Sequence, residues 1–225
     1  AFIRSAVGFG DALLAMPLLA LAVGLSITTP LVGITSLIVS AVLLAASWRS
    51  VNLTAGWRLI VASAAGAPLG LWVLTNADEW IMHVVLGGVL VGYGAYNLLR
   101  PGLPPLRSEL WAFPFGFVAG ILGSAYNTSG PPVIIYGTMR RWSPDAFRAT
   151  LQGFFLVNSV MIAVGHAATG LWTAEVLWLT IFSLPALALG MVAGVAAQRR
   201  ISPAAFSRVV YVLLIVLGGM FLLPL

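Results

Sequence analysis

The apolar positions along this chain form runs near the length that a helix needs to cross a membrane, about 20 residues. Six uninterrupted runs lie at 29–47, 57–76, 80–99, 149–169, 175–197 and 205–224. Two further apolar stretches, 1–25 and 110–139, are interrupted by glycine, proline and polar residues. The pattern therefore predicts six transmembrane helices and two broken segments.

The arginines predict how the second broken segment runs. The connectors around 100–109 and 140–148 are both rich in arginine, so both are expected on the cytoplasmic side. A single crossing by 110–139 would leave the six arginines from Arg140 to Arg208 outside. A segment that enters and returns leaves ten of the eleven arginines on one side. We therefore predict a re-entrant helical hairpin over 110–139, with its turn at the centre of the bilayer.

The two broken segments share a local pattern. The stretch GFGDALLAMP (8–17) aligns without a gap with GSAYNTSGPP (123–132), and the same offset pairs Thr35 with Thr150. Each broken segment precedes three clean spans, an odd number, so the second unit enters the membrane in the opposite orientation. We predict an all-α polytopic membrane protein with two inverted repeats, 1–100 (hairpin 1–25) and 101–225 (hairpin 110–139).

Composition agrees with this class. The chain is 60% hydrophobic and 8% charged, whereas soluble domains carry about a quarter charged residues. The net charge of +5 comes from arginines in connectors, which indicates membrane topology rather than nucleic-acid binding. The absence of cysteine excludes disulfides, thiolate metal sites and cysteine nucleophiles, and we expect no cofactor. The chain begins at Ala1 inside an apolar run, so we expect further sequence before it.

Small residues recur at four-residue spacing inside the spans, which suits close approach of helices in lipid. The pairs are Gly66 with Gly70, Gly88 with Gly92, Gly116 with Gly120, and Gly190 with Gly194. We interpret them as packing seams without chemistry.

The centre of the second broken segment predicts an anion site. Asn127, Thr128 and Ser129 precede Gly130 and Pro131, a helix-start signature of capping side chain followed by proline. A helix that begins there directs its unpaired N–H groups and positive dipole end at the membrane centre. The first segment would bring a second helix tip, near 11–17, to the same point. The alternative is that the polar residues only cap a broken helix.

Arg4 and Asp11 are the charged residues inside the apolar regions, and such residues are functional candidates. Arg4 could bind an anion with its planar fork of donors, pair with Asp11, or lie at a membrane surface. Asp11 would repel an anion unless protonated or paired, so it is a candidate for proton coupling or for a structural pair. His83 and His166 are expected at membrane interfaces. Further candidates to contact the substrate are Gly8, Gly10, Thr35, Tyr126, Thr150, Gln152 and Asn158.

The stretches GFGDALLAMPLL (8–19) and GILGSAYNTSGPPVIIYG (120–137) resemble the two glycine- and proline-containing motifs of the sulfite-exporter (TauE/SafE) family of permeases. Family members usually have a run of glycines in the first motif, where Asp11 stands here. The resemblance implies transport of a small sulfur-containing anion, such as sulfite, a sulfonate or thiosulfate, across the bacterial inner membrane. We expect lipid contacts, arginine-rich loops in the cytoplasm and no nucleic-acid partner; a homodimer is compatible with the pattern.

Two other functions remain open at this point. An anion channel would share every sequence feature described. An intramembrane serine protease would use Ser129 as nucleophile and His166 as base, which requires the two within hydrogen-bond reach. The predicted positions, Ser129 near mid-membrane and His166 toward the outer end of its helix, favour a transporter over an enzyme.

Overall fold

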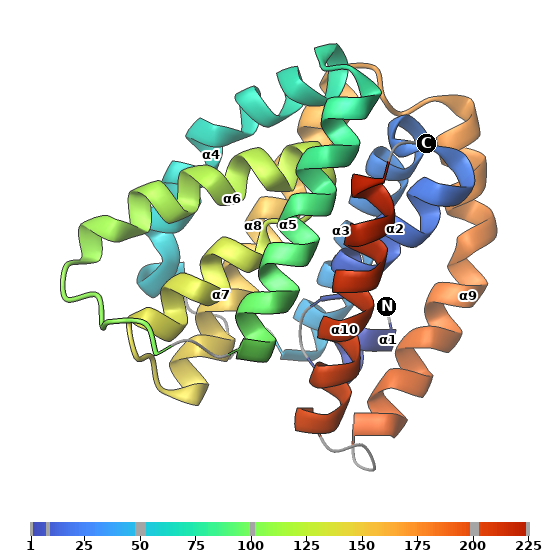
Figure 1. The fold of residues 1–225 in the computed structure, drawn as a ribbon. Helices are drawn as coiled ribbons and strands as arrows, with labels where there is room; N and C mark the ends of the chain where they lie inside the picture. The colour runs from blue at the N-terminus through green and yellow to red at the C-terminus, as the bar shows by residue number, and fades with distance from the viewer. Residues whose placement is uncertain (1, 8–9, 48–52, 100–101, 199–202, 224–225) are drawn as a thin grey trace.

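The structure is a computed structural model that describes residues 2–7, 10–47, 53–99, 102–198 and 203–223. Regular secondary structure in these ranges is entirely helical (Figure 1). The helices are α1 (Phe2–Val7), α2 (Asp11–Val23), α3 (Leu25–Ser47), α4 (Leu53–Asn76), α5 (Glu79–Leu99), the short 3₁₀ helix η2 (Glu109–Trp111), α6 (Ala112–Tyr126), α7 (Gly130–Met139), α8 (Pro144–Ala168), α9 (Ala174–Gln198) and α10 (Pro203–Leu222).

Each predicted span corresponds to one long helix, namely α3, α4, α5, α8, α9 and α10. The first five are long and apolar enough to cross a membrane within the described residues. Three predicted starts, 29, 57 and 149, are wrong, because the helices begin at Leu25, Leu53 and Pro144. Helix α3 begins at Leu25 because Gly24, with a left-handed φ of 78°, separates it from α2. Helix α8 begins at Pro144 because the Ser143 hydroxyl caps it, accepting from Ala146 N at 3.4 Å.

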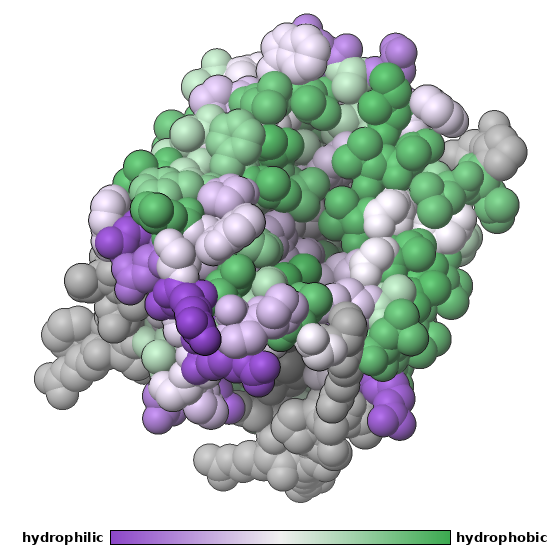
Figure 2. All heavy atoms as spheres, turned by 60° about the vertical axis from the view of Figure 1, so that its left-hand side comes forward, coloured by the Kyte–Doolittle hydropathy of each residue, from purple (hydrophilic) through white to green (hydrophobic). Residues whose placement is uncertain are grey.

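The outer surface is apolar along much of its length. Phe182, Leu189 and Val192 of α9 are each at least 70% exposed. Figure 2 shows hydrophobic residues over most of one face, with hydrophilic residues gathered toward its lower and upper ends. A wide apolar surface between polar ends is what lipid contact requires. The chain is therefore a polytopic helical membrane protein.

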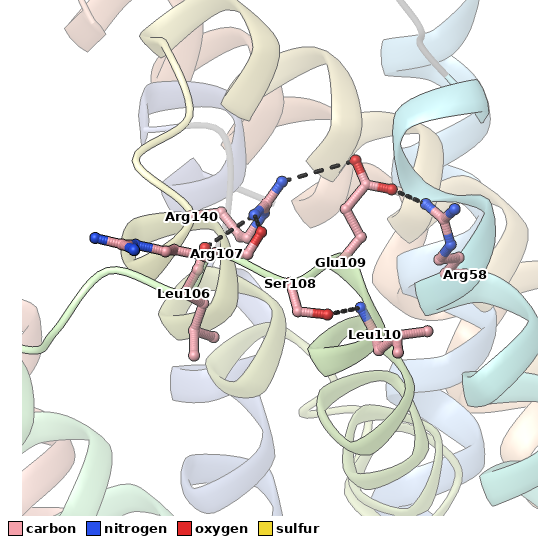
Figure 3. A network of polar contacts seen from close by, with 7 residues as sticks. All are labelled: Arg58, Leu106, Arg107, Ser108, Glu109, Leu110 and Arg140. Carbon is pink, nitrogen blue, oxygen red and sulfur yellow. Dashed lines mark hydrogen bonds and ion pairs between the residues drawn. The ribbon is translucent and has the colours of Figure 1, made fainter.

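Helices α6 and α7 form the predicted hairpin, because the two ends of the segment 110–139 are bonded together. Leu106 N donates to Met139 O at 3.0 Å. The Arg140 guanidinium donates to the carbonyl oxygens of Leu106 (2.8 Å) and Arg107 (2.7 Å). Glu109 links this corner to α4, since it accepts a hydrogen bond from Arg58 and lies 3.7 Å from Arg140 (Figure 3). The segment thus enters the molecule and returns to the side from which it started.

Glycines set the contact between α4 and α6. A methyl group at Gly120 would lie 2.1 Å from Ser63 O, and one at Gly66 would lie 2.2 Å from Phe117 O. The two backbones therefore touch, and the predicted packing seams at Gly66–Gly70 and Gly116–Gly120 are confirmed. The predicted seam at Gly88–Gly92 is wrong, because nothing among the described residues lies within 4 Å of a methyl group at either glycine.

The packing partners in the two halves of the chain correspond. Helix α4 packs on α6 and α8, and α9 packs on α1 and α3. Helix α5 packs on α10, and α3 packs on α8. If each helix from α1 to α5 is exchanged for its counterpart from α6 to α10, in order, the same packing pairs result. Two repeats related by a two-fold axis would require this. The inverted orientation itself stays a prediction.

The gapless alignment of the two broken segments does not match the observed helix breaks. It pairs the turn at 127–129 with residues 12–14, which lie inside α2. The first break instead ends at Gly10, whose φ of 92° is left-handed and suits glycine. The first segment therefore breaks earlier along its length than the second.

We expect Gly120→Ala to destabilise the protein, because the added methyl group would force the α4 and α6 backbones apart. Overpacking of this kind costs about 1–3 kcal/mol or more. Gly88→Ala is the matched control and should be neutral or slightly stabilising, because its site is open and alanine favours helix. Thermal unfolding in detergent measures both variants, and equal stability would contradict the contact.

Single cysteines at Leu103 and Ser143 should both be labelled from the same side of the membrane, and we expect the cytoplasmic side from the arginine distribution. Asn76 and Thr169 are exposed at the C-terminal ends of α4 and α8. Cysteines at these two positions should be labelled from the opposite side of the membrane. The chain has no native cysteine, so each label reports one position. Labelling of 103 and 143 from opposite faces would exclude the hairpin topology.

Candidate functional site

A pocket lies where the two broken segments meet. It has an empty volume of about 500 Å³, part of which is open to solvent. Helices α2 and α7, distant in sequence, both begin at this pocket. The lining residues come from α1, α2, α3, the turn between α6 and α7, and α8: Arg4, Gly10, Asp11, Ala12, Leu13, Ser36, Asn127, Thr128, Ser129, Gly130, Phe155, Asn158, Ser159 and Ile162.

The turn between α6 and α7 is held by backbone and side-chain bonds. Asn127 ends α6 with a left-handed φ of 54°, a conformation that asparagine adopts more readily than most residues. Its Nδ2 donates to the Thr29 carbonyl of α3 at 2.6 Å. Thr128 donates to Leu122 O from both its N (3.2 Å) and its Oγ1 (3.4 Å). The turn therefore has a defined shape and is anchored to a second helix.

The predicted capping side chain at the start of α7 is wrong. Ser129 already has a helical backbone, with φ −67° and ψ −15°, and its side chain does not cap the helix. It is 4% exposed and lines the pocket. The interpretation that Asn127 and Ser129 only cap a broken helix is thus not what the geometry shows: Asn127 bonds to α3, and Ser129 lines the pocket.

The two helix starts offer different groups to a ligand. Pro131 and Pro132 have no N–H, so α7 keeps only the N–H groups of Gly130 and Val133 in its first turn. Helix α2 has its first proline at Pro17 and keeps every N–H of its first turn. The start of α2 could therefore donate most of the backbone hydrogen bonds to an anion in the pocket. The start of α7 would attract the anion mainly through the helix dipole.

Arg4 and Asp11 bring opposite charges to the pocket. Arg4 is 8% exposed, its Nη1 donates to Ser36 O at 3.4 Å, and its guanidinium lies 5.6 Å from the centroid of the Phe155 ring. A guanidinium stacked on a ring keeps donors at its edge for a ligand. Asp11 is the first residue of α2, a position where the helix dipole favours a carboxylate.

One face of α8 forms a wall of the pocket. Phe155, Asn158, Ser159 and Ile162 follow the spacing of a single helix face. Asn158 Oδ1 accepts from Ser63 Oγ of α4 at 2.7 Å, which fixes the amide. The sequence pattern indicated Asn158 but not the other three, although their spacing from Asn158 could have identified them.

Several predicted site residues lie away from the pocket. The Thr35 hydroxyl donates to Leu31 O of its own helix at 3.0 Å, whereas the next residue, Ser36, lines the pocket. The Tyr126 hydroxyl donates to Met82 Sδ at 3.2 Å. The others are Pro131 and Thr150, which are buried outside the lining, Gln152, which is exposed, and Gly8, which lies outside the described residues.

His166 lies behind the turn, and its predicted interface position is wrong. It is fully buried, and its Nε2 lies 2.8 Å from Ser124 O. A methyl group at Gly33 would lie 3.0 Å from His166 Nδ1 and 3.4 Å from Asn127 Oδ1, so the ring and the turn face the same point of α3. The protease alternative fails on this geometry, because His166 bonds to Ser124 and is not part of the lining that contains Ser129.

The chain is similar in sequence to known proteins. The model of the sulfite exporter TauE/SafE family matches residues 1–221, nearly the whole chain. The chain belongs to the TauE/SafE family. The TauE/SafE name and the names of the relatives below indicate a membrane transporter rather than an enzyme.

Two curated relatives support the TauE/SafE assignment. One is the probable sulfite/organosulfonate exporter TauE of Cupriavidus necator, 27% identical over 176 residues that cover 75% of this chain and 69% of that protein. The other is the probable inner membrane transporter protein TsaS of Comamonas testosteroni, 29% identical over 175 residues that cover 76% and 70%. No solved structure matches the chain.

We expect His166→Phe to lower stability and His166→Gln to retain most of it. Phenylalanine removes the partner of the buried Ser124 carbonyl, and an unsatisfied buried group costs about 1–3 kcal/mol. Glutamine places an amide donor near the position of Nε2. Thermal unfolding in detergent compares the two, and equal loss in both variants would show that the hydrogen bond is not what matters.

Proposed function

We propose that this chain is a secondary transporter that binds a small sulfur-containing anion in the pocket and carries it across the bacterial inner membrane. Sulfite, a sulfonate or thiosulfate are the candidates. The observation that carries the proposal is the convergence of two helix starts and one buried arginine on a single pocket. The names of the relatives, a sulfite/organosulfonate exporter and an inner membrane transporter, favour the same substrate class and location.

The lengths of the two hairpin helices support a position of this pocket near mid-membrane. Helix α6 has 15 residues and α7 has 10, so they extend about 22 Å and about 15 Å from the corner that joins their outer ends. Those lengths reach roughly the middle of a 30 Å hydrocarbon core. Irregular backbone at that depth is tolerated where it lines a cavity, which is where the turn at 127–129 lies.

The corresponding packing of the two halves supports alternating access between repeats 1–100 and 101–225. In transporters with inverted repeats, the site lies at the repeat interface and one repeat moves against the other. Arg4 and Asp11 come from the first repeat, whereas the turn at 127–129 and Asn158 come from the second. The pocket would therefore open to one side or the other as the repeats move.

Membrane potential favours export without a coupled ion. A membrane potential that is negative inside the cell favours outward movement of an anion by about 2.3 kcal/mol per charge per 100 mV. Uptake would need at least that much energy from protons or sodium. Asp11 is the acidic residue in the apolar segments, and the second repeat has no counterpart. Uncoupled export is therefore the simplest hypothesis.

In liposomes loaded with labelled methanesulfonate, an inside-negative potential should drive saturable efflux, and collapse of the potential should slow it. Ser129→Ala should raise KM about tenfold to a hundredfold, because a hydrogen bond to a charged group contributes about 1.5–3 kcal/mol. The direction of this effect follows from the position of Ser129 in the pocket lining.

Thr35→Val is the control for Ser129→Ala, since the Thr35 hydroxyl bonds within its own helix and should not affect KM. Flux that does not saturate and shows no counterflow would indicate a channel. Strict dependence on external acid, lost in Asp11→Asn, would instead indicate proton-coupled uptake.

A further inference from the structure

The side-chain charges among the described lining of the pocket are balanced. We infer that the pocket selects oxyanions with a single negative charge over those with two, and that Asp11 is the residue that rejects the second charge. The inference rests on the proposed function, because it concerns the same anion site.

Arg4 and Asp11 are the charged residues among the described lining. Residues 5–9, which follow Arg4 in the sequence, are Ser, Ala, Val, Gly and Phe, so they add no charge. A charged cluster of Arg58, Glu109 and Arg140 lies at the outer corner of the hairpin (Figure 3). The two side-chain charges of the described lining cancel whether or not they touch each other.

The starts of α2 and α7 supply the remaining positive potential. A helix start is equivalent to roughly half a unit charge, and α2 and α7 have 13 and 10 residues. Two such starts match about one negative charge. In apolar surroundings an unmatched second charge is poorly tolerated. Specificity commonly comes from a repulsive group placed against the wrong ligand, and Asp11 is such a group here.

The lining also provides a place for the uncharged part of a monoanion. Leu13, Phe155 and Ile162 contribute apolar surface, whereas Arg4, Ser129 and Asn158 contribute donors. A sulfonate presents three oxygens and one carbon group, and a lining with both donors and apolar surface offers contacts to each. A dianion such as sulfate has a charged oxygen in place of the carbon group, and contact of that oxygen with apolar surface is unfavourable.

Methanesulfonate and sulfate test this inference, because both are tetrahedral sulfur anions and differ by a methyl group in place of a charged oxygen. In the liposome assay, sulfate should compete with labelled methanesulfonate at least about tenfold more weakly than unlabelled methanesulfonate does. Asp11→Asn should raise the ratio of sulfate affinity to methanesulfonate affinity about tenfold. Asp78→Asn, which removes an exposed carboxylate between α4 and α5, should leave this ratio unchanged.

The outcomes separate the two proposals. Saturable methanesulfonate transport with equally strong competition by sulfate would overturn charge selection and leave the anion site in place. An equal loss of affinity for both anions in Asp11→Asn would also overturn charge selection, because Asp11 would then have a structural role. If methanesulfonate, sulfite and thiosulfate all fail to bind, both proposals are overturned. If Asp11→Asn does not fold, the wild-type ratio alone decides.

Discussion

Every backbone N–H and C=O group that leaves a helix inside an apolar layer must find a partner within the protein, since lipid offers none. The turn at 127–129 meets this constraint through three neighbours. Its own helix accepts the N–H groups of Asn127 (2.8 Å) and Thr128 (3.2 Å). Helix α3 accepts the Asn127 side chain at 2.6 Å, and α8 places His166 2.8 Å from the Ser124 carbonyl. The pocket exists because these partners allow the chain to break there.

The seam between α4 and α6 determines where that break lies. Gly120 brings α6 against the backbone of Ser63, and the Ser63 hydroxyl in turn holds Asn158 of the pocket wall. The corner at Glu109 ties the outer end of the hairpin to Arg58 of the same helix. Helix α4 thus positions the hairpin at two points along its length, and one of them is bonded directly to the site.

The hairpin and the long helices could be predicted from the sequence, because arginine distribution and apolar run length respond to the bilayer itself. The convergence of Asp11 and Ser129 on one pocket followed from the broken motifs. The rotation of each helix about its axis could not be predicted. Thr35 was expected at the site, but Ser36 lines it, a difference of about 100° around the helix. Helices that are apolar on all sides carry no stripe to fix that rotation.

The two prolines that open α7 have a consequence for the lifetime of a bound anion. They remove two N–H donors from the helix start, while the peptide dipoles of the rest of α7 remain aligned. The dipole acts at a distance and speeds arrival, whereas short hydrogen bonds mainly determine the dissociation rate. The start of α7 is therefore expected to raise the association rate of an anion more than it lowers the dissociation rate. For a protein that must release each molecule before accepting the next, a short residence time permits fast turnover.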